Sequence, residues 1–386
     1  MRVAIVAHNL RVAGGLSVGK NVVSALGRVA DEHDYLLILP GGVGYEDVPK
    51  PSRATCYFCR WRGGLAGQLF FEQWRLPRVV RRFKPDLVWG LGNFGLRRPG
   101  APQAVLLQQA YFVYDPGEQV RPIWRSGLKV QVTKRRLRQS LPATQLVFCQ
   151  TKTMSRRFAE TFGYTGQLAL LPNAVSHATE TGNSDRPAIF EGLQGKFALL
   201  CLTRYYLHKN LEILLDVFRR HHSELGNVAL LVTFASEQHP RAHRFLAQLH
   251  DSVLENHIIN VGPVEQADLA GYLTHCDALL LPTVLESFSG TYLEAMQFGL
   301  PILTSDLDFA RDICGQAAVY FDPYRTASIR DAILSVKDSQ AKRAELVEAG
   351  RQQFESFVKD WDSIVYDAVQ KLESIVQSAD ERGHRR

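Results

Sequence analysis

Long apolar runs are missing from this chain of 386 residues. Apolar runs such as residues 35–39 and 278–281 fall far short of the roughly 20 residues that cross a bilayer. The short apolar run at residues 3–7 is typical of a buried strand, because a signal peptide has a longer apolar region and a cleavage site. The sequence therefore predicts a cytoplasmic protein.

Cysteine is scarce, with six residues, and only Cys56 and Cys59 have the spacing of metal ligands. No second Cys or His pair lies near them to complete four ligands, so we expect no zinc site. The other cysteines are typical of small core residues in a reducing compartment, where disulfides do not persist.

Acidic residues are absent from residues 119–159, which contain ten Lys and Arg. Residues 1–172 hold 25 Lys and Arg against 10 Asp and Glu, whereas residues 173–386 hold 20 against 29. The first half therefore carries a net charge of +15 and favours an anionic partner. Nucleic acid, a membrane surface and a phosphorylated acceptor all meet that description.

Short strand-like runs alternate with helical patterns along most of the chain, which predicts an α/β architecture with parallel sheets. The expected strands lie at residues 3–7, 35–39, 87–89, 104–107, 146–149, 197–202, 228–233, 258–261, 278–281 and 301–304. The expected helices lie at residues 16–30, 69–83 (with a possible kink at Pro77), 211–222, 242–254, 268–274, 290–298 and from 361 onward.

The length favours two domains, each a doubly wound Rossmann-like sheet, facing each other across a cleft. We assign residues 1–172 to an acceptor-binding domain and residues 196–358 to a donor-binding domain. Residues 173–195, rich in small polar residues, are predicted to be a linker. The amphipathic helix at 361–380 is expected to pack back on the first domain.

The stretch from Leu280 to Pro301 carries two carboxylates where a buried strand leads into a helix. Small residues at the helix start allow backbone N–H groups to approach an anion such as a diphosphate. Glu294, about one turn into the helix, has the position to accept hydrogen bonds from ribose hydroxyls, and Glu286 in the loop from a sugar. The alternative is a pair of surface carboxylates stabilised by the helix dipole.

A second cluster, Thr203 to Asn210, follows the predicted strand at 197–202. Arg204 and Lys209 are cations that can stabilise the charge on a departing nucleoside diphosphate, so that no metal cofactor is required. The alternative is a solvated loop.

Together, the Arg-x4-Lys-Asn loop and the Glu-x7-Glu pair resemble the donor half of glycosyltransferase family 4, retaining enzymes of the GT-B fold. Further matches, such as Val261-Gly262-Pro263-Val264 and Gly299-Leu300-Pro301, extend the resemblance over residues 197–325. It implies that Arg204 and Lys209 bind the diphosphate, that Glu286 contacts the transferred sugar, and that Glu294 holds the ribose. The other implied donor-binding positions are Thr203, Phe288, Ser289, Gly290 and Thr291. Thr203 stands where the family has Gly, and Ser289-Gly290-Thr291 replaces Gly-Leu-Pro.

The first half resembles the family less closely. Gly14 and Gly15 stand between a strand and a helix, where the family places a glycine loop against donor and acceptor, so the resemblance implies that they bind the donor. A simple turn is the alternative. Gln109 occupies the place of a family histidine and cannot shuttle a proton, but it and Tyr111 can bind an acceptor.

The Asp306-Leu307-Asp308 run has the Asp-x-Asp pattern of metal-dependent sugar transferases of another fold, but turn and capping roles explain it better here.

The resemblance implies a retaining transfer of a hexose-type sugar from GDP-mannose or a UDP-sugar to a glycan or lipid-linked acceptor, in bacterial surface polysaccharide synthesis. Apolar residues interleaved with the basic residues of 121–138 favour contact with an anionic membrane. A sugar-nucleotide epimerase is the main alternative. A phosphorylase is a weaker alternative, because the sequence shows no identifiable cofactor lysine site. A nucleic-acid-binding protein is also weaker, because the sequence shows no zinc-finger, RRM or helix-turn-helix motif.

Overall fold

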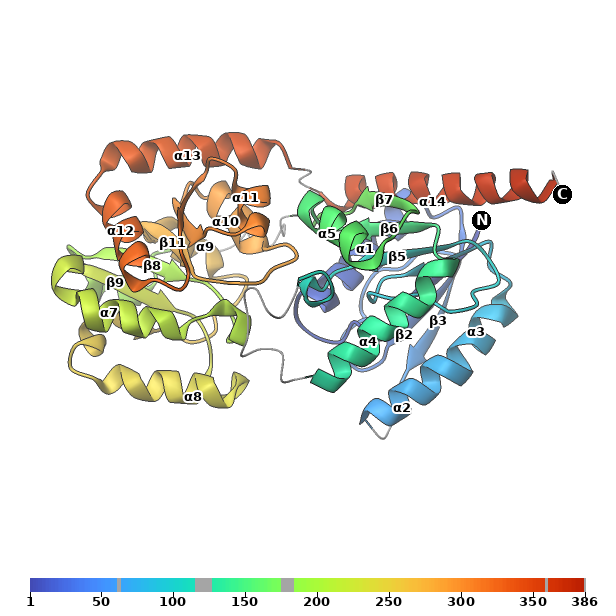
Figure 1. Cartoon of the computed structure of the whole chain (residues 1–386), viewed down its shortest axis with the longest axis horizontal. Helices are drawn as coiled ribbons and strands as arrows, with labels where there is room; N and C mark the ends of the chain where they lie inside the picture. Colours follow the sequence, from blue (N-terminus) through green and yellow to red (C-terminus); the bar gives the residue numbers. More distant parts are fainter. Residues whose placement is uncertain (61–63, 115–126, 175–183, 358–359, 385–386) are drawn as a thin grey trace. The chain divides into compact units, whose positions relative to one another are not determined.

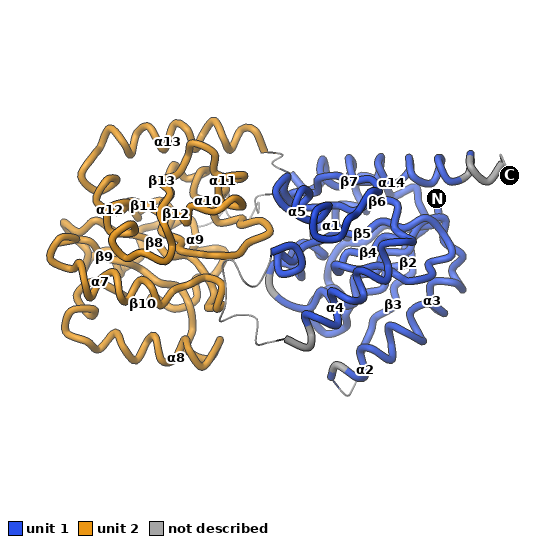
Figure 2. Tube along the Cα trace, in the orientation of Figure 1, with its two compact units in different colours: residues 1–115, 125–174, 358–386 blue, residues 116–124, 175–357 orange. Residues whose placement is uncertain are grey.

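The computed structural model describes residues 1–60, 64–114, 127–174, 184–357 and 360–384. The chain divides into two compact units (Figure 2). Of the described residues, unit 1 holds 1–114, 127–174 and 360–384, and unit 2 holds 184–357. Each unit is an α/β body built around its own parallel sheet (Figure 1).

Unit 1 contains a seven-stranded sheet in the order β3-β2-β1-β4-β5-β6-β7, with every pairing parallel. Its strands are β1 (Arg2–Val6), β2 (Asp34–Pro40), β3 (Ala54–Cys59), β4 (Leu87–Gly90), β5 (Gln103–Leu107), β6 (Leu146–Cys149) and β7 (Gln167–Leu170). Side chains alternate between the two faces of β1, so that Val3 and Ile5 join one core cluster, and Ala4 and Val6 join another. The sheet is therefore buried on both faces, as a parallel sheet requires.

Helices cover both faces of this sheet. They are α1 (Ala13–Val29), α2 (Gly64–Phe70), the π-helix η1 (Phe71–Arg75), α3 (Leu76–Phe83), α4 (Gly127–Ser140), α5 (Lys152–Phe162) and α14 (Trp361–His384), with short 3₁₀ turns at η2 (Ala110–Phe112) and η4 (Leu141–Ala143). The predicted helix start at residue 16 is wrong: α1 begins at Ala13, so Gly14 and Gly15 lie in its first turn rather than in a loop before it.

A π-helical turn marks the site of the expected kink at Pro77. The Leu76 N–H donates to the Phe71 carbonyl five residues earlier, as a π-helix does. Because Pro77 has no N–H, it cannot satisfy the carbonyl of Gln73, and a widened turn just before the proline accommodates that loss. The helical run continues from α2 through η1 into α3 without a break in the chain's helical assignment.

Unit 2 contains a six-stranded parallel sheet in the order β10-β9-β8-β11-β12-β13. The strands are β8 (Phe197–Cys201), β9 (Val228–Val232), β10 (Ile258–Asn260), β11 (Ala278–Leu281), β12 (Ile302–Ser305) and β13 (Ala318–Phe321). The helices are α7 (Glu212–Leu225), α8 (Pro240–Ala247), α9 (Leu269–His275), α10 (Gly290–Gln297), α11 (Asp308–Cys314), α12 (Thr326–Lys337) and α13 (Gln340–Glu355). Short 3₁₀ turns are η5 (Ala188–Leu193), η6 (Leu207–Lys209), η7 (Ser236–Gln238), η8 (Gln248–His250) and η9 (Leu254–Asn256).

Part of the predicted linker is folded. Among its described residues, Ala188–Leu193 form η5, and Phe190 and Leu193 are buried in unit 2. The Phe190 ring lies against Tyr272 of α9, with 6.2 Å between the ring centroids. This part of the predicted linker is therefore attached to unit 2 by buried apolar side chains. Residues 175–183 lie outside the described residues.

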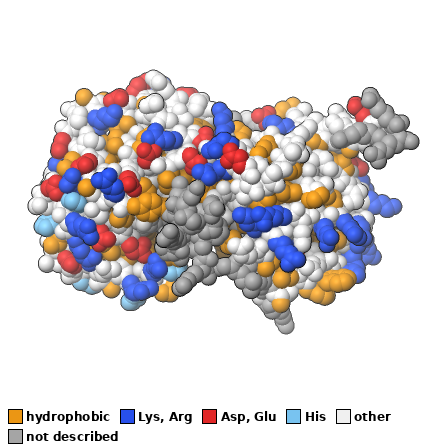
Figure 3. Space-filling view, viewed as in Figure 1, with side chains coloured by type: hydrophobic (Ala, Val, Ile, Leu, Met, Phe, Trp, Pro, Cys, Tyr) orange, Lys and Arg blue, Asp and Glu red, His pale blue; other side chains and the backbone are white. Residues whose placement is uncertain are grey.

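Charge is unevenly spread over the surface. On the face in Figure 3, Lys and Arg lie over α3 and α4 of unit 1 with few acidic side chains among them, whereas both signs are mixed over unit 2. This agrees with the excess of basic residues counted in the first half of the sequence.

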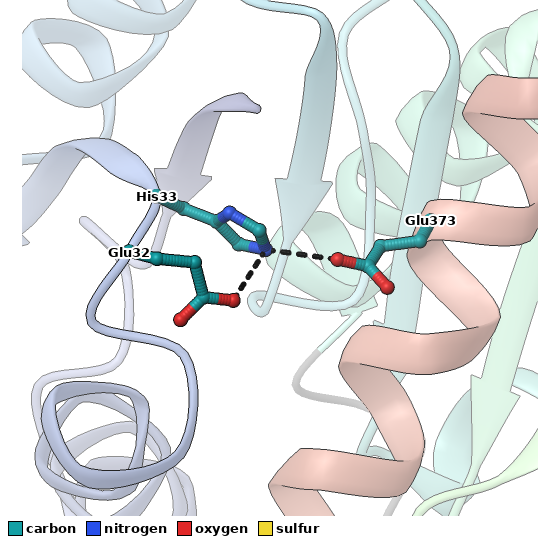
Figure 4. A group of neighbouring side chains, drawn as sticks. All are labelled: Glu32, His33 and Glu373. Atoms are coloured by element: carbon teal, nitrogen blue, oxygen red, sulfur yellow. Dashed lines mark hydrogen bonds and ion pairs between the residues drawn. The ribbon is translucent and has the colours of Figure 1, made fainter.

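The last helix, α14, belongs to unit 1 and packs against α1. Trp361, Ile364, Val365 and Val369 are buried in the same core cluster as β1. His33, at the turn before β2, is also close to α14, with its Nε2 atom 3.0 Å from a carboxylate oxygen of Glu373 and 3.5 Å from one of Glu32 (Figure 4). Among the described residues, this trio is the group with metal-ligand spacing, and its observed contacts attach α14 to unit 1.

Candidate active site

In the parallel sheet of unit 2, β8 pairs side by side with β11. From this pair, β9 and β10 follow outward on one side, and β12 and β13 follow on the other. Ligands of open α/β sheets bind outside the carboxyl ends of the strands at such a switch point. The two loops that leave this point are residues 202–211, after β8, and residues 282–289, after β11. They contain six of the residues singled out in the sequence: Thr203, Arg204, Lys209, Glu286, Phe288 and Ser289.

The loop after β8 is held by contacts to two other segments of unit 2. Tyr205 is buried, and its backbone N–H donates to the Gln238 side chain over 2.7 Å. Asn210 adopts a left-handed conformation with φ of 53°, and its amide donates to the carbonyl of Pro323, after β13, over 2.9 Å. Between these anchors, η6 presents Lys209. The position of the cation is therefore set by the backbone.

The two loops are joined at the carbonyl of His208. The backbone N–H of Val284 donates to it over 2.8 Å, and the Thr283 hydroxyl over 3.2 Å. Beside this junction, the Lys209 ammonium donates to a carboxylate oxygen of Glu286. The side chains of Lys209 and Glu286 are 14% and 13% exposed, so the structure brings together one predicted cation and one predicted carboxylate in a mostly desolvated pair.

Glu294 lies in the second turn of α10, four residues after the helix start at Gly290. Burial raises the pKa of its carboxyl group to about 7. At neutral pH the group is therefore close to half protonated, so a ligand that hydrogen-bonds to the carboxylate changes its protonation readily.

The start of α10 is open to a ligand. Ser289 is the N-cap residue, it is buried, and its side chain makes no capping hydrogen bond. No acidic residue lies in the first turn, and an added Cβ at Gly290 would meet nothing within 4 Å. The Tyr292 N–H donates to the Ser289 carbonyl over 3.3 Å, which leaves the N–H groups at the very start of the helix for an anion. Thr291 is half-buried in the same turn, while the Phe288 ring is buried and packs edge-on against Phe357.

Arg204 is not part of the ion pair. Its side chain is exposed, and its guanidinium group has no carboxylate partner among the described residues. Thr203, next to it, is tied back to the sheet, because its N–H donates to the Thr233 hydroxyl over 2.9 Å. The sequence expected Arg204 and Lys209 to act together, and the structure shows only Lys209 held against Glu286.

His208 is a site residue that the sequence argument did not single out. Burial lowers its pKa to about 4, against the opposing effect of Glu286. It is therefore neutral at physiological pH, and its ring stacks on Tyr206 with 5.4 Å between centroids. The sequence could have indicated His208 as a site residue, because it directly precedes Lys209.

Unit 1 holds Gly14 and Gly15, which were predicted to bind the donor, and Gln109 and Tyr111, which were predicted on the acceptor side. Gly14 is exposed, and a Cβ on Gly15 would lie 3.3 Å from Leu10. Gln109 is exposed, and its backbone N–H donates to the Asn93 side chain over 2.9 Å. Tyr111 is half-buried in η2.

Unit 1 also has a switch point, between β1 and β4, and it carries a second group that the sequence did not reveal. His8 Nε2 lies 2.7 Å from a carboxylate oxygen of Glu72, and both side chains are buried. Burial lowers the pKa of His8 to about 3, so it is neutral at physiological pH. The position of His8 just after the first strand could have indicated a site residue. Nothing in the sequence predicts its contact with Glu72 of η1.

The basic residues expected at a membrane do not all lie on the surface of the described structure. Residues 121–126 lie outside the described residues. In α4, Arg135 and Arg138 are exposed, whereas Arg136 turns inward and donates to Glu72. Among the described residues, no helix combines the length and apolarity needed to cross a membrane.

The Asp-x-Asp run lies between β12 and α11. Asp306 pairs with Arg311 over 2.5 Å, and Asp308 is the first residue of α11. The N-cap residue is Leu307, so neither aspartate caps the helix with its side chain from that position.

Comparison with known proteins gives the same fold and a match for unit 2. Residues 187–353 match the family model of the glycosyl transferases group 1. A glycogen synthase of Mycobacterium tuberculosis is 32% identical over 127 residues, which are 32% of this chain and 29% of the relative. A 2-deoxystreptamine N-acetyl-D-glucosaminyltransferase of Niallia circulans is 26% identical over 178 residues, 45% of this chain and 44% of the relative. The chain thus matches less than half the length of these curated relatives.

Solved structures resemble the whole chain. A sucrose-phosphate synthase from Thermosynechococcus elongatus has a TM-score of 0.73 at 15% identity, covering 98% of this chain and 100% of the other. HepE of Anabaena, solved in complex with UDP, has a TM-score of 0.72 at 14% identity, covering 97% and 100%. WaaG, a glycosyltransferase involved in lipopolysaccharide biosynthesis, has a TM-score of 0.71 at 13% identity, covering 96% and 99%. At these identities the likeness shows the fold: two Rossmann-like units of the GT-B type. Residues 187–353 of its second unit resemble the glycosyl transferases group 1.

Proposed function

We propose that this protein is a retaining glycosyltransferase that moves a hexose-type sugar from a nucleotide-diphosphate sugar, GDP-mannose or a UDP-sugar, to a glycan or lipid-linked acceptor. The observation that carries the proposal is the Lys209–Glu286 pair at the switch point of unit 2, next to the open start of α10. The group 1 match over the same unit and the UDP complex of the structurally similar HepE support it.

The geometry suits departure of a nucleoside diphosphate. An ammonium group has three donors, and Glu286 accepts from one, so Lys209 keeps donors for phosphate oxygens. The first-turn N–H groups of α10 and the exposed guanidinium of Arg204 add positive potential for the same diphosphate. These groups stabilise the charge that develops as the glycosidic bond breaks, which is the usual basis of catalysis at such a site. The proposed reaction needs no metal cofactor.

The proposed transfer takes place on one face of the sugar. The bond from the anomeric carbon to the diphosphate breaks, and its electron pair stays on the phosphate oxygen. The acceptor hydroxyl bonds to the same face of that carbon and gives its proton to the departing phosphate. In this proposal Glu286 holds the transferred sugar and Glu294 holds the ribose.

A thermal-shift screen of GDP-, UDP-, dTDP- and ADP-sugars tests the proposal. We expect one nucleotide series to stabilise the protein, followed by transfer to an acceptor with retained anomeric configuration, measured by NMR. Consumption of the sugar nucleotide without an acceptor would instead indicate an epimerase. If no nucleotide sugar shifts the melting temperature and nucleic acid binds in a gel shift, the proposal is wrong.

We also propose that the basic surface of unit 1 holds the protein at an anionic membrane, in bacterial surface polysaccharide synthesis. The exposed side chains of Arg135 and Arg138 support this proposal. Flotation with neutral and anionic vesicles tests it. Equal recovery with both kinds of vesicle would count against membrane binding.

A further inference from the structure

A groove of about 580 Å³ lies on unit 1, and all of its lining residues belong to that unit. Three segments form it: η1 with α3, the loop after β4, and the C-terminal half of α4. In Figure 1, α3 and α4 run along the same side of unit 1. The volume is within the range of small-molecule sites, roughly 300–1,000 Å³.

Four arginines line the groove: Arg81, Arg97, Arg98 and Arg136. Glu72 is the acidic residue among the lining residues, and its side chain is fully buried. Four positive charges against one negative charge leave the groove with a net charge of +3. Figure 3 shows the same excess of basic side chains over α3 and α4.

Glu72 cannot neutralise the other arginines, because its oxygens are already engaged. One oxygen lies 2.7 Å from His8 Nε2 and accepts from Gln68 over 3.0 Å, and the other accepts from Arg136. Among the described residues, Arg81, Arg97 and Arg98 form no ion pair with a carboxylate. Their charge is therefore available to a ligand.

Arg136 is fixed in place while keeping free donors. Its guanidinium stacks over the Phe94 ring at 4.1 Å, and one nitrogen donates to Glu72. Burial lowers its pKa to about 10, so it stays protonated at neutral pH. Its remaining N–H groups have no acceptor among the described residues, and an anion in the groove can supply one.

The loop that carries Arg97 and Arg98 is held by a buried side chain. Gln103 accepts from the Leu96 N–H over 2.7 Å and donates to the Leu96 carbonyl over 3.2 Å. The Gly95 N–H donates to the Ser140 hydroxyl, which attaches the loop to α4. A site held in shape before binding loses less entropy when it takes a ligand.

We propose that this groove binds the phosphate group of an anionic ligand. Guanidinium groups converge on it from three segments, and phosphate has enough oxygens to accept from several of them, whereas a carboxylate fills a single fork. Trp74, 54% exposed at the groove, offers a flat apolar surface to the rest of the ligand. The phosphate can come from a soluble compound or from a lipid headgroup. The proposal does not depend on the transferase reaction.

The test uses Trp74 fluorescence with two probes at fixed ionic strength: inorganic pyrophosphate, and phosphatidylcholine vesicles with and without phosphatidylglycerol. We expect a saturable change with at least one probe, and no such change in Trp74→Phe. Arg97→Gln/Arg98→Gln should weaken binding by roughly tenfold or more, because it removes two charge-assisted contacts. Response to pyrophosphate identifies a soluble phosphate, and response to anionic vesicles alone identifies a headgroup.

Arg75→Gln/Arg82→Gln is the matched control, because it removes the same charge from exposed positions outside the groove lining. We expect it to keep binding within about twofold, since exposed charges that do not line the groove are screened by salt. The proposal is overturned if neither probe gives saturable binding, or if the control weakens binding as much as the groove variant. Tighter binding of glucuronate than of pyrophosphate would also overturn it. Nucleotide-sugar thermal shifts, measured in parallel, show whether unit 2 is intact in each variant.

Discussion

At the residue scale, the buried carboxyl group of Glu294 links the stability of the fold to pH. Its folded-state pKa is raised to about 7 from the ordinary 4.5, so the folded protein binds a proton more tightly than the unfolded chain does. Stability linked to this group is therefore fully present below pH 4.5 and is lost as pH rises through 7. The change amounts to at most about 3 kcal/mol.

Glu294→Gln should therefore be more stable than the parent above pH 7 and similar to it below pH 4.5. The neutral amide keeps the shape of the side chain and avoids the buried charge. Urea unfolding at pH 4.5, 6 and 8 measures the difference. In the same variant we expect weaker donor binding, because an amide offers one acceptor oxygen instead of two. A stability difference that stays constant across this pH range would show that Glu294 is not the titrating group.

The second prediction at this scale concerns Lys209. Lys209→Ala should lower kcat by about 10²–10³-fold with a smaller change in KM, because the lost charge acts mainly on the departing diphosphate. Steady-state kinetics with the identified donor measures the split. Removing the lysine also leaves Glu286 mostly buried without its partner, so thermal unfolding must accompany the kinetics. Lys209→Arg keeps the charge and serves as the control. An unchanged kcat in a folded Lys209→Ala protein would remove Lys209 from the mechanism.

At the element scale, α14 contributes to the core of unit 1 although it lies at the end of the sequence. Leu372 is 2% exposed in that core, while Tyr366 on the same helix is 50% exposed. Leu372→Ala should destabilise the protein by about 2–5 kcal/mol through lost apolar burial and the cavity that remains. Tyr366→Ala should change stability by less than about 0.5 kcal/mol. Chemical denaturation of both variants tests whether α14 is part of the folded unit. Equal effects would contradict the packing.

The same scale shows which elements the sequence could predict. Central strands such as β1, β8 and β11 are continuous buried runs, and the sequence predicted all three. The strands that it did not predict, β3, β7 and β13, lie at sheet edges and are only partly buried, so they lack such runs. Edge strands need pairing information that a local pattern does not contain.

In the candidate site, too, the contacts that could be predicted are those between residues that follow predictable strands. Lys209 and Glu286 are 77 residues apart, yet each follows a predictable strand, so their convergence at one sheet edge could be expected. The contact between Glu72 and Arg136 joins η1 to α4, two elements with no shared motif or strand end. It depends on how the helices pack over the sheet, and the sequence pattern gave no sign of it.

At the scale of the whole molecule, each unit has its own sheet and its own buried residues, so each has the means to unfold as a separate cooperative body. We expect scanning calorimetry to resolve two transitions. A nucleoside diphosphate at 100 times its Kd should stabilise the unit that binds it by about 2.7 kcal/mol. For a unit of this size, that raises the melting temperature by roughly 5–10 °C.

The two transitions can be assigned with variants already described. Leu372→Ala should lower only the transition of unit 1, because its contacts lie in that core. The nucleotide should raise only the other transition, since Lys209, Glu286 and Glu294 all belong to unit 2. Lys209→Ala should reduce that shift without moving the first transition. If the nucleotide raises the transition that Leu372→Ala lowers, the diphosphate is held by unit 1, and the assignment of the donor site to the loops after β8 and β11 is wrong.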